Sequence, residues 1–288
     1  MQKILQLIRV KHYIKNVFVF MPLFFYGGIK NVELLFNATL AFVAFCLVAS
    51  SVYILNDIND VEDDRAHSKK QFRPIANGDV SIPSALVLFA LLLLLSAFIS
   101  FYLSIKVMVL ILAYFVLNVA YTYILKTLPI LDITTIAVGF VIRIFVGASA
   151  VSVELSHWIV VMTFLLALFL AAAKRRDDVL IYLQTGKKMR SVIGGYNIKF
   201  LDATISMLGS IVIVAYLMYS TSAEVISQLN NQHVYLTSLF VIIGVLKYMH
   251  SVLVIENTGS PTLMVFKDRA LQVIIVAWLA SFAWIIYS

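Results

Sequence analysis

Residues 82–103, IPSALVLFALLLLLSAFISFYL, contain no charged side chain and are long enough to cross a bilayer as one helix. Similar apolar runs recur from the first twenty residues of the chain to the last. The whole chain is 62% hydrophobic and 13% charged, whereas soluble domains carry about 25% charged residues. Because no linker rich in Gly, Ser or Pro separates the runs, we predict a single all-α integral-membrane domain that covers residues 1–288.

Polar interruptions divide the apolar sequence into candidate transmembrane helices. Nine are predicted, at residues 14–29, 34–55, 82–103, 107–125, 131–150, 155–173, 203–221, 234–255 and 271–287. The first is short and contains Pro22, which disfavours a continuous helix. Eight spans therefore remain the alternative.

The distribution of basic residues supports nine spans. With the N-terminus in the cytoplasm, 18 of the 22 Lys and Arg residues lie on the cytoplasmic side, Lys30 and Lys106 lie on the other, and Arg143 and Lys247 fall within spans. One span more or less would move later loops to the opposite side and destroy this asymmetry. We therefore expect a multi-pass protein of the cell (inner) membrane whose N-terminus and active site are cytoplasmic. The net charge of +7 then requires no nucleic-acid partner.

An acidic stretch follows the second predicted span. If that helix continues, Asn56, Asp60 and Asp64 recur every four residues, and Asp57 shares their face. The like charges repel unless a cation binds between them. Mg²⁺ prefers carboxylate oxygens and completes its shell with substrate phosphates, so we predict that these four residues bind Mg²⁺. The alternative is a solvated loop in which Asn56 or Asp57 caps a helix.

Cationic residues follow the acidic ones directly and suit the phosphates of a diphosphate leaving group. They are Arg65, His67, Lys69, Lys70 and Arg73, of which we predict that Lys70 and Arg73 bind substrate. A second polar centre, KRRDD at residues 174–178, follows the sixth span. Helical spacing places Lys174 near Asp178, and we predict that Lys174, Arg175 and Asp178 contact substrate. The alternative is a cytoplasmic cationic flank, which is also our interpretation of Lys187, Lys188 and Arg190.

Arg143 lies near the middle of the span 131–150, where an unpaired charge costs a few kcal/mol. We therefore expect it to face an internal polar cavity. Four further polar residues lie at the cytoplasmic ends of spans and are candidate substrate-binding groups: Lys15, Asn16, Tyr123 and Lys126. For the lysines the alternative is that they extend to the membrane surface without a further role.

The pattern NDxxDxxxD at residues 56–64, followed by His67, Lys70 and Arg73-Pro74, resembles the first signature of the UbiA-type intramembrane prenyltransferase superfamily. That resemblance implies about nine transmembrane helices around a central cavity. Further segments are similar to one branch of the family: VKHYIKNVFVFMPLFF, RPIANG, the run from Ala120 to Ala150, KRRDD and GSPTLMVFKDR. In this branch the 5-phosphoribose of phosphoribosyl pyrophosphate moves to a polyprenyl phosphate and diphosphate is released.

The resemblance implies an Mg²⁺-dependent membrane glycosyltransferase. In it Asp60, Asp64, Lys174 and Arg143 are catalytic. The substrate-binding residues are Lys15, Asn16, Asn56, Lys70, Arg73, Tyr123, Lys126, Arg175 and Asp178. One departure bears on the donor, because family members with a prenyl diphosphate donor carry a second aspartate-rich motif where this chain has three cations before Asp177-Asp178. An aromatic prenyltransferase using a polyprenyl diphosphate remains the alternative. A transporter is disfavoured because only Arg143 and Lys247 are charged residues within spans and no repeat is visible. Chain length of the lipid and oligomeric state are not predicted.

Overall fold

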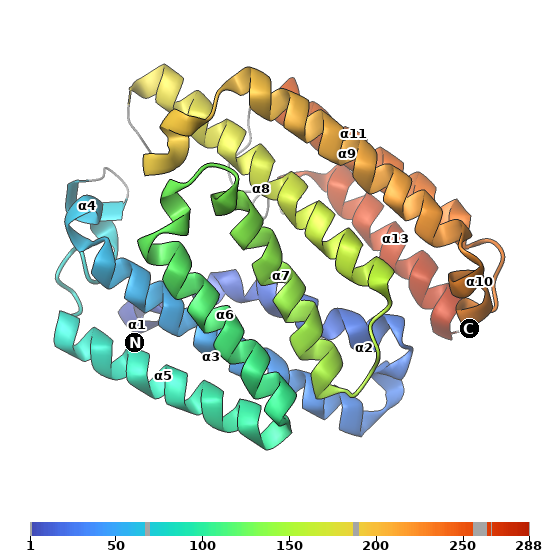
Figure 1. The fold of residues 1–288 in the computed structure, drawn as a ribbon, viewed down its shortest axis with the longest axis horizontal. Helices are drawn as coiled ribbons and strands as arrows, with labels where there is room; N and C mark the ends of the chain where they lie inside the picture. The colour runs from blue at the N-terminus through green and yellow to red at the C-terminus, as the bar shows by residue number, and fades with distance from the viewer. Residues whose placement is uncertain (1, 67–69, 187–189, 256–263, 266, 288) are drawn as a thin grey trace. The chain divides into compact units, whose positions relative to one another are not determined.

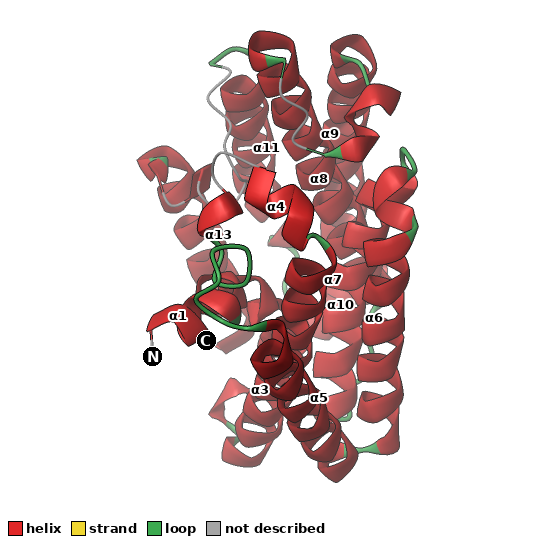
Figure 2. Cartoon of the chain, turned by 90° about the vertical axis from the view of Figure 1, so that its left-hand side faces the viewer, coloured by secondary structure: helices red, strands yellow, loops and turns green. Residues whose placement is uncertain are grey.

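A computed structural model describes all residues of the chain except 1, 67–69, 187–189, 256–263, 266 and 288. Helices account for all regular structure in this described part, and no strand is found there (Figure 2). The chain divides into two compact units. Unit 1 comprises residues 1–125 and 139–155, and unit 2 comprises residues 126–138 and 156–288. Helix α7, Leu131–Ala150, therefore begins in unit 2 and ends in unit 1.

Unit 1 is built around the long helix α3, Val32–Asn59, against which α5, α6 and η1 pack (Figure 1). Buried alanines on α3, including Ala41 and Ala44, allow this close approach, and the Ser96 hydroxyl of α5 donates to the carbonyl of Ala44 at 2.8 Å. The other elements of unit 1 are α1 Gln2–Leu7, η1 Val10–Phe20, α2 Met21–Phe25, η2 Gly28–Lys30, α4 Val61–Ala66, η3 Lys70–Phe72, α5 Ile82–Leu103 and α6 Ile105–Tyr123.

In unit 2, α8 packs against α9, and α11 packs against both α9 and α13 (Figure 1). Phe169, Ile205 and Val252 belong to the apolar core between these helices. Arg176 of α8 links this helix to α9 and α11, because it donates to the Asp202 carboxylate and, at 2.8 Å, to the carbonyl of Val252. The short η4, Leu125–Thr127, begins at the last residue of unit 1's first segment and continues into unit 2. The other elements of unit 2, apart from its share of α7, are α8 His157–Thr185, η5 Ser191–Gly195, α9 Ile198–Thr221, α10 Ala223–Leu229, η6 Val234–Thr237, α11 Ser238–Leu253 and α13 Arg269–Tyr287.

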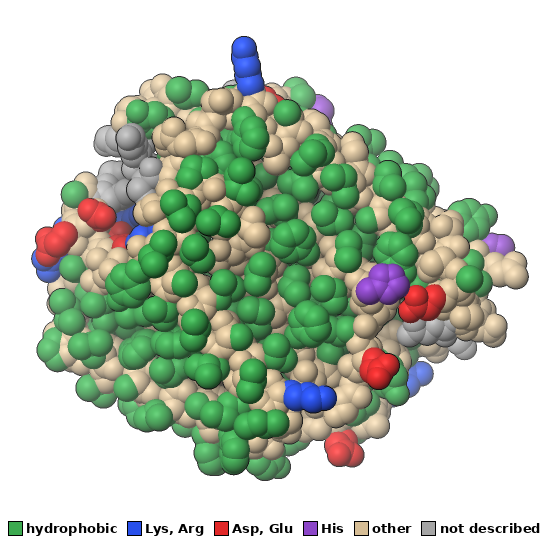
Figure 3. Space-filling model, in the orientation of Figure 1, with side chains coloured by type: hydrophobic (Ala, Val, Ile, Leu, Met, Phe, Trp, Pro, Cys, Tyr) green, Lys and Arg blue, Asp and Glu red, His purple; other side chains and the backbone are tan. Residues whose placement is uncertain are grey.

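Eight helices of the described residues are long and apolar enough to cross a membrane, and they correspond to the second to ninth predicted spans. The ranges of α5 and α7 match the predicted ones. Apolar side chains cover much of the face seen in Figure 3, and α5 alone exposes Leu94, Phe98 and Phe101. Such a surface is suited to lipid, so the chain is a multi-pass membrane protein.

The first predicted span, 14–29, forms parts of three short helices, η1, α2 and η2, instead of one continuous helix. Val10–Phe20 is a 3-10 helix, and the α-helix Met21–Phe25 follows it with Pro22 in its first turn, where the missing N–H costs nothing. This segment runs antiparallel to α3. The Tyr13 hydroxyl hydrogen-bonds Ser50 at 2.8 Å, and Leu23 packs in one cluster with Ala38.

The 3-10 conformation explains how so short a segment can follow α3 over this length. Residues 38–57 of α3 cover about 28 Å, at about 1.5 Å per residue. Residues 9–23 run beside them, from the ion pair of Arg9 with Asp57 to the packing of Leu23 on Ala38. They must rise about 2 Å per residue, which is the rise of a 3-10 helix. The segment is therefore about as long as the hydrocarbon core is thick, roughly 30 Å.

Gly147 of α7 allows this segment to approach closely, because a Cβ atom at position 147 would lie 1.9 Å from the Val19 carbonyl oxygen. We expect Gly147→Ala to lower the thermal unfolding temperature in detergent. The backbone displacement costs about 1–3 kcal/mol, more than the roughly 1 kcal/mol that alanine gains in a helix. Gly244→Ala is the control, because its Cβ would be 3.4 Å from the nearest atom, on Ile274. Equal stability of the two variants would contradict the close approach.

Candidate active site

The acidic cluster of unit 1 lies where α3 passes into α4. Asp60 separates the two helices, but the N–H of Asp60 donates to the carbonyl of Asn56 at 2.9 Å and that of Asp64 to the carbonyl of Asp60 at 2.8 Å. The helical register therefore continues across the break. As a result, Asp57 and Asp64 reach the same group, the Nη1 of Arg73, at 3.0 and 2.6 Å. The predicted shared face is confirmed for these two aspartates.

Asp57 and Asp64 are buried, with 2% and 1% of their surfaces exposed, and each is paired with cations. Asp57 Oδ1 also accepts from Arg9, and Lys70 Nζ lies 3.8 Å from Asp64 Oδ1. Buried carboxylates require such partners, because desolvation of an unpaired charge costs several kcal/mol. The cluster is thus already balanced in charge by this chain's own arginines.

Arg9 is a site residue that the sequence pattern did not predict, because its position indicates only membrane topology. Its guanidinium pairs with Asp57 and lies 4.7 Å from the centre of the Tyr53 ring. Its backbone has φ of 53°, a left-handed conformation, directly before the 3-10 helix. The turn at Arg9 therefore directs a cation of the N-terminal segment to the end of α3.

One oxygen of the acidic cluster suits a hard cation. Asp64 Oδ1 is buried and makes no hydrogen bond among the described residues. The neighbouring Asn56 accepts a hydrogen bond from Thr122, and Asp60 accepts one from Asn59 at 2.7 Å. The described residues contain no group of three or more His, Cys, Asp or Glu side chains that could hold a metal alone. These residues fit Mg²⁺ only if substrate phosphates complete the coordination, which is its usual mode of binding.

Arg143 is buried in unit 1 and faces the protein interior, not lipid. Its Nε donates to Asn16 at 2.9 Å, its Nη1 to the carbonyl of Gly139 at 2.7 Å and its Nη2 to the Tyr114 hydroxyl at 3.3 Å. The rings of Phe45, Tyr114 and Phe140 lie 4.7–5.2 Å from the guanidinium carbon. Arg143 was expected to face a polar cavity. In the structure it is surrounded by a packed shell of amide, hydroxyl and aromatic groups. Asn16 is part of that shell and also donates to Cys46 at 3.2 Å.

The charged cluster of unit 2 is centred on Arg175, which is 2% exposed. Its guanidinium donates to Asp132 of α7 and, at 2.8 Å, to Asp178 Oδ2. The Tyr196 hydroxyl donates to Asp132 Oδ1 and accepts from the N–H of Ile130, both at 2.6 Å. Burial, together with the hydrogen bond to Asp132, raises the pKa of Tyr196, so the phenol remains a donor. Arg175 is thus enclosed by carboxylates.

Two other cations on Asp178 are more accessible than Arg175. Lys174 Nζ lies 3.6 Å from Asp178 Oδ1, as the four-residue spacing predicts, and Arg190 Nε lies 3.2 Å from Asp178 Oδ2. The Arg190 side chain is 41% exposed. From its sequence context Arg190 was expected only in a cytoplasmic flank, because nothing in the sequence shows that Arg190 returns to Asp178.

The remaining predicted residues lie outside these two clusters or outside the described part of the chain. Tyr123 is exposed at the end of α6, and Lys15 and Lys126 are partly exposed on η1 and η4. His67, Lys69, Lys187 and Lys188 are outside the described residues. Lys247, to which no role was given, pairs with Asp268 at 3.2 Å.

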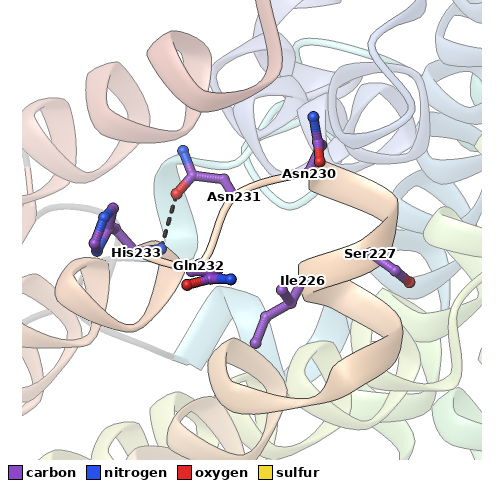
Figure 4. A pocket seen from close by; sticks show the side chains of 6 residues that line it. All are labelled: Ile226, Ser227, Asn230, Asn231, Gln232 and His233. Atoms are coloured by element: carbon purple, nitrogen blue, oxygen red, sulfur yellow. Dashed lines mark hydrogen bonds between the residues drawn. The ribbon is translucent and has the colours of Figure 1, made fainter.

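A shallow pocket of unit 2 contains none of the predicted site residues. Ile226, Ser227, Asn230, Asn231, Gln232 and His233 line it between α10 and η6 (Figure 4). The hydrogen bond drawn in Figure 4 runs from the His233 N–H to Asn231 Oδ1 at 2.8 Å and stabilises the turn between α10 and η6. We therefore place the candidate chemistry in the two charged clusters and not in this pocket.

Comparison with known proteins gives consistent results for sequence and fold. Residues 17–267 match the UbiA prenyltransferase family. The decaprenyl-phosphate phosphoribosyltransferase of Mycolicibacterium smegmatis is 32% identical, over 99% of this chain and 92% of that protein. The protein of the same name from Corynebacterium glutamicum is 30% identical, over 97% of this chain and 85% of that protein.

Solved structures share the fold at lower sequence identity. A UbiA homologue from Archaeoglobus fulgidus bound to GPP and Mg²⁺ superimposes with a TM-score of 0.74 at 19% identity, over 99% of this chain and 100% of that one. A UbiA homologue from Aeropyrum pernix gives a TM-score of 0.70 at 15% identity, over 94% and 98% of the two chains.

Proposed function

Because this chain belongs to the UbiA prenyltransferase family, we propose that it is a membrane enzyme that moves 5-phosphoribose from phosphoribosyl pyrophosphate to a polyprenyl phosphate. The observation that carries this proposal is the similarity of nearly the whole chain to two enzymes named for that transfer. An oxygen of the lipid phosphate attacks the anomeric carbon of the ribose as the bond to diphosphate breaks. The acceptor is already an anion near neutral pH, so the attack needs little base catalysis.

We assign the donor diphosphate to the acidic cluster of unit 1. Asp64, with Asp60 and Asn56, would hold Mg²⁺, which when bound neutralises the charge that develops on the leaving diphosphate. Asp57 accepts from two arginines, so its role is to hold Arg9, and before substrate binds also Arg73, in place. Lys70 and Arg73 then bind phosphate oxygens. Asp57 was expected to bind the metal, and its pairing supports this revised role.

For the charged cluster of unit 2 we propose a different division of roles. Lys174 and Arg190 are partly exposed and bind a substrate phosphate, and Asp178 positions both. Arg175, expected to bind phosphate, instead fixes Asp132 and Asp178 in the buried network. Lys15, Tyr123 and Lys126 remain candidates for the lipid phosphate, and Arg143 with Asn16 has a positioning role in unit 1. The N-terminus and both clusters are proposed to be cytoplasmic, in the cell membrane, in keeping with the basic loops.

The donor assay tests this function against aromatic prenyl transfer. Purified protein in detergent receives Mg²⁺, a polyprenyl phosphate and phosphoribosyl pyrophosphate labelled in the ribose. We expect label to enter the organic phase and diphosphate to be released in equal amount. The parallel reaction contains labelled geranyl diphosphate and an aromatic acceptor. Transfer in this reaction alone would contradict the proposal and favour the alternative.

A further inference from the structure

Arg73 lies between two aspartates at the place where a cation is needed. Its Nη1 is 3.0 Å from Asp57 Oδ1 and 2.6 Å from Asp64 Oδ2. Both carboxylates are almost fully buried. One guanidinium nitrogen therefore bridges two carboxylates that would otherwise repel each other. From the sequence, a divalent metal was predicted to offset this repulsion.

The bridge leaves part of Asp64 available. Arg73 engages Oδ2, whereas the buried Oδ1 makes no hydrogen bond among the described residues. Lys70 Nζ is 3.8 Å from this oxygen, beyond hydrogen-bonding distance. Burying a carboxylate oxygen without a hydrogen bond is costly, so this oxygen is available to a ligand.

The charges around Asp64 make it a poor site for a free divalent cation. Arg9, Lys70 and Arg73 already neutralise the two aspartates, so their repulsion cancels most of the attraction that a bare ion with two positive charges would feel from the carboxylates. A metal that arrives on a diphosphate carries net negative charge and meets attraction instead. Arg73 is partly exposed and can leave the carboxylates for a phosphate oxygen, to which a guanidinium binds well.

We propose that Arg73 is a built-in countercation that stabilises Asp57 and Asp64 before substrate binds and makes the metal site dependent on the diphosphate. The metal and the donor then bind together, and Arg73 moves from carboxylate to phosphate as they do. The proposal rests on the proposed function only in requiring a diphosphate donor, so it holds equally for ribosyl and prenyl donors.

Binding of Mn²⁺ alone tests the proposal without any turnover. Free Mn²⁺ is followed by its paramagnetic resonance in titrations of detergent-solubilised full-length protein. Arg73→Gln removes the competing charge, and we expect it to bind Mn²⁺ about tenfold more tightly than wild type, because a like charge within a few ångström is lost. Its binding of inorganic diphosphate in the presence of Mn²⁺ should be weaker. A residue that served only as a phosphate ligand, or only for folding, would not strengthen metal binding.

Arg65→Gln is the matched control. It makes the same charge change on the adjacent α4, where Arg65 pairs with the exposed Glu62 at 2.9 Å, and we expect a change in Mn²⁺ affinity below twofold. Unchanged or weaker Mn²⁺ binding by Arg73→Gln would overturn the proposal, as would equal strengthening by both variants.

Wild-type protein gives a second test in case Arg73→Gln does not fold. Inorganic diphosphate should increase the amount of Mn²⁺ bound by at least tenfold, after correction for the complex that the two form in solution. Equal binding of Mn²⁺ with and without diphosphate would overturn the proposal. Neither titration contains a ribosyl or prenyl donor, so failure of the proposed function would appear in the donor assay and not here.

Discussion

Asp64→Asn is expected to reduce kcat/KM by about a thousandfold while the protein still folds in detergent. Metal stabilisation of a leaving group contributes several kcal/mol, and each 1.36 kcal/mol corresponds to tenfold in rate. The amide retains the shape of the carboxylate but removes the anionic oxygen, Oδ1, that is buried without a hydrogen bond. Turnover is measured with labelled donor, and thermal unfolding is measured on the same samples.

Asp63→Asn is the control for this change. Asp63 is the adjacent residue on α4 and is exposed, so its substitution removes the same charge without touching the buried cluster. We expect activity within twofold of wild type. Excess EDTA should abolish activity of the wild type and of Asp63→Asn. Full activity in EDTA, or equal losses for the two variants, would contradict the assignment of Asp64 to the metal.

The transmembrane architecture was predictable because lipid imposes a simple rule on sequence. Each span must be apolar for about 20 residues, so α5 and α7 could be bounded from composition alone. The first span was the exception. Its 3-10 conformation depends on packing along α3 and on Gly147, and neither contact is visible in a local window.

The candidate site was predictable where it lies on one helix and not where it joins distant segments. Asp57 and Asp64 share a face by helical spacing, which survives the break at Asp60. The partner Arg9 is 48 residues away from Asp57, and Arg190 reaches Asp178 only because the chain folds back after α8. No periodicity encodes such pairings.

Lys174 and Arg175 show a second limit of sequence analysis. Neighbouring residues on a helix point about 100° apart, so one of two adjacent cations can be buried while the other remains accessible. Both residues were predicted from the sequence to contact substrate phosphate, and Lys174 was also predicted to be catalytic. The structure encloses Arg175 between Asp132 and Asp178 and leaves Lys174 partly exposed. This difference leads to opposite expectations for their substitution.

Arg175→Met is expected to destabilise the fold by about 3–5 kcal/mol, because it leaves the buried carboxylates of Asp132 and Asp178 without their shared cation. Lys174→Met should unfold within about two degrees of wild type. It should instead raise the KM for the donor tenfold to a hundredfold, since a charged hydrogen bond contributes about 1.5–3 kcal/mol. Thermal unfolding and donor titrations on both variants separate the two roles.

A compensating variant distinguishes loss of charge balance from loss of packing at Arg175. If uncompensated carboxylates are the cause, adding Asp132→Asn and Asp178→Asn to Arg175→Met should restore most of the unfolding temperature, because substitutions within one network are strongly non-additive. If the guanidinium stabilises only by filling space, the triple variant should be no more stable than Arg175→Met. If Arg175→Met has normal stability and a raised KM for the donor, the structural role is wrong. Arg175 then binds substrate phosphate, as predicted from the sequence.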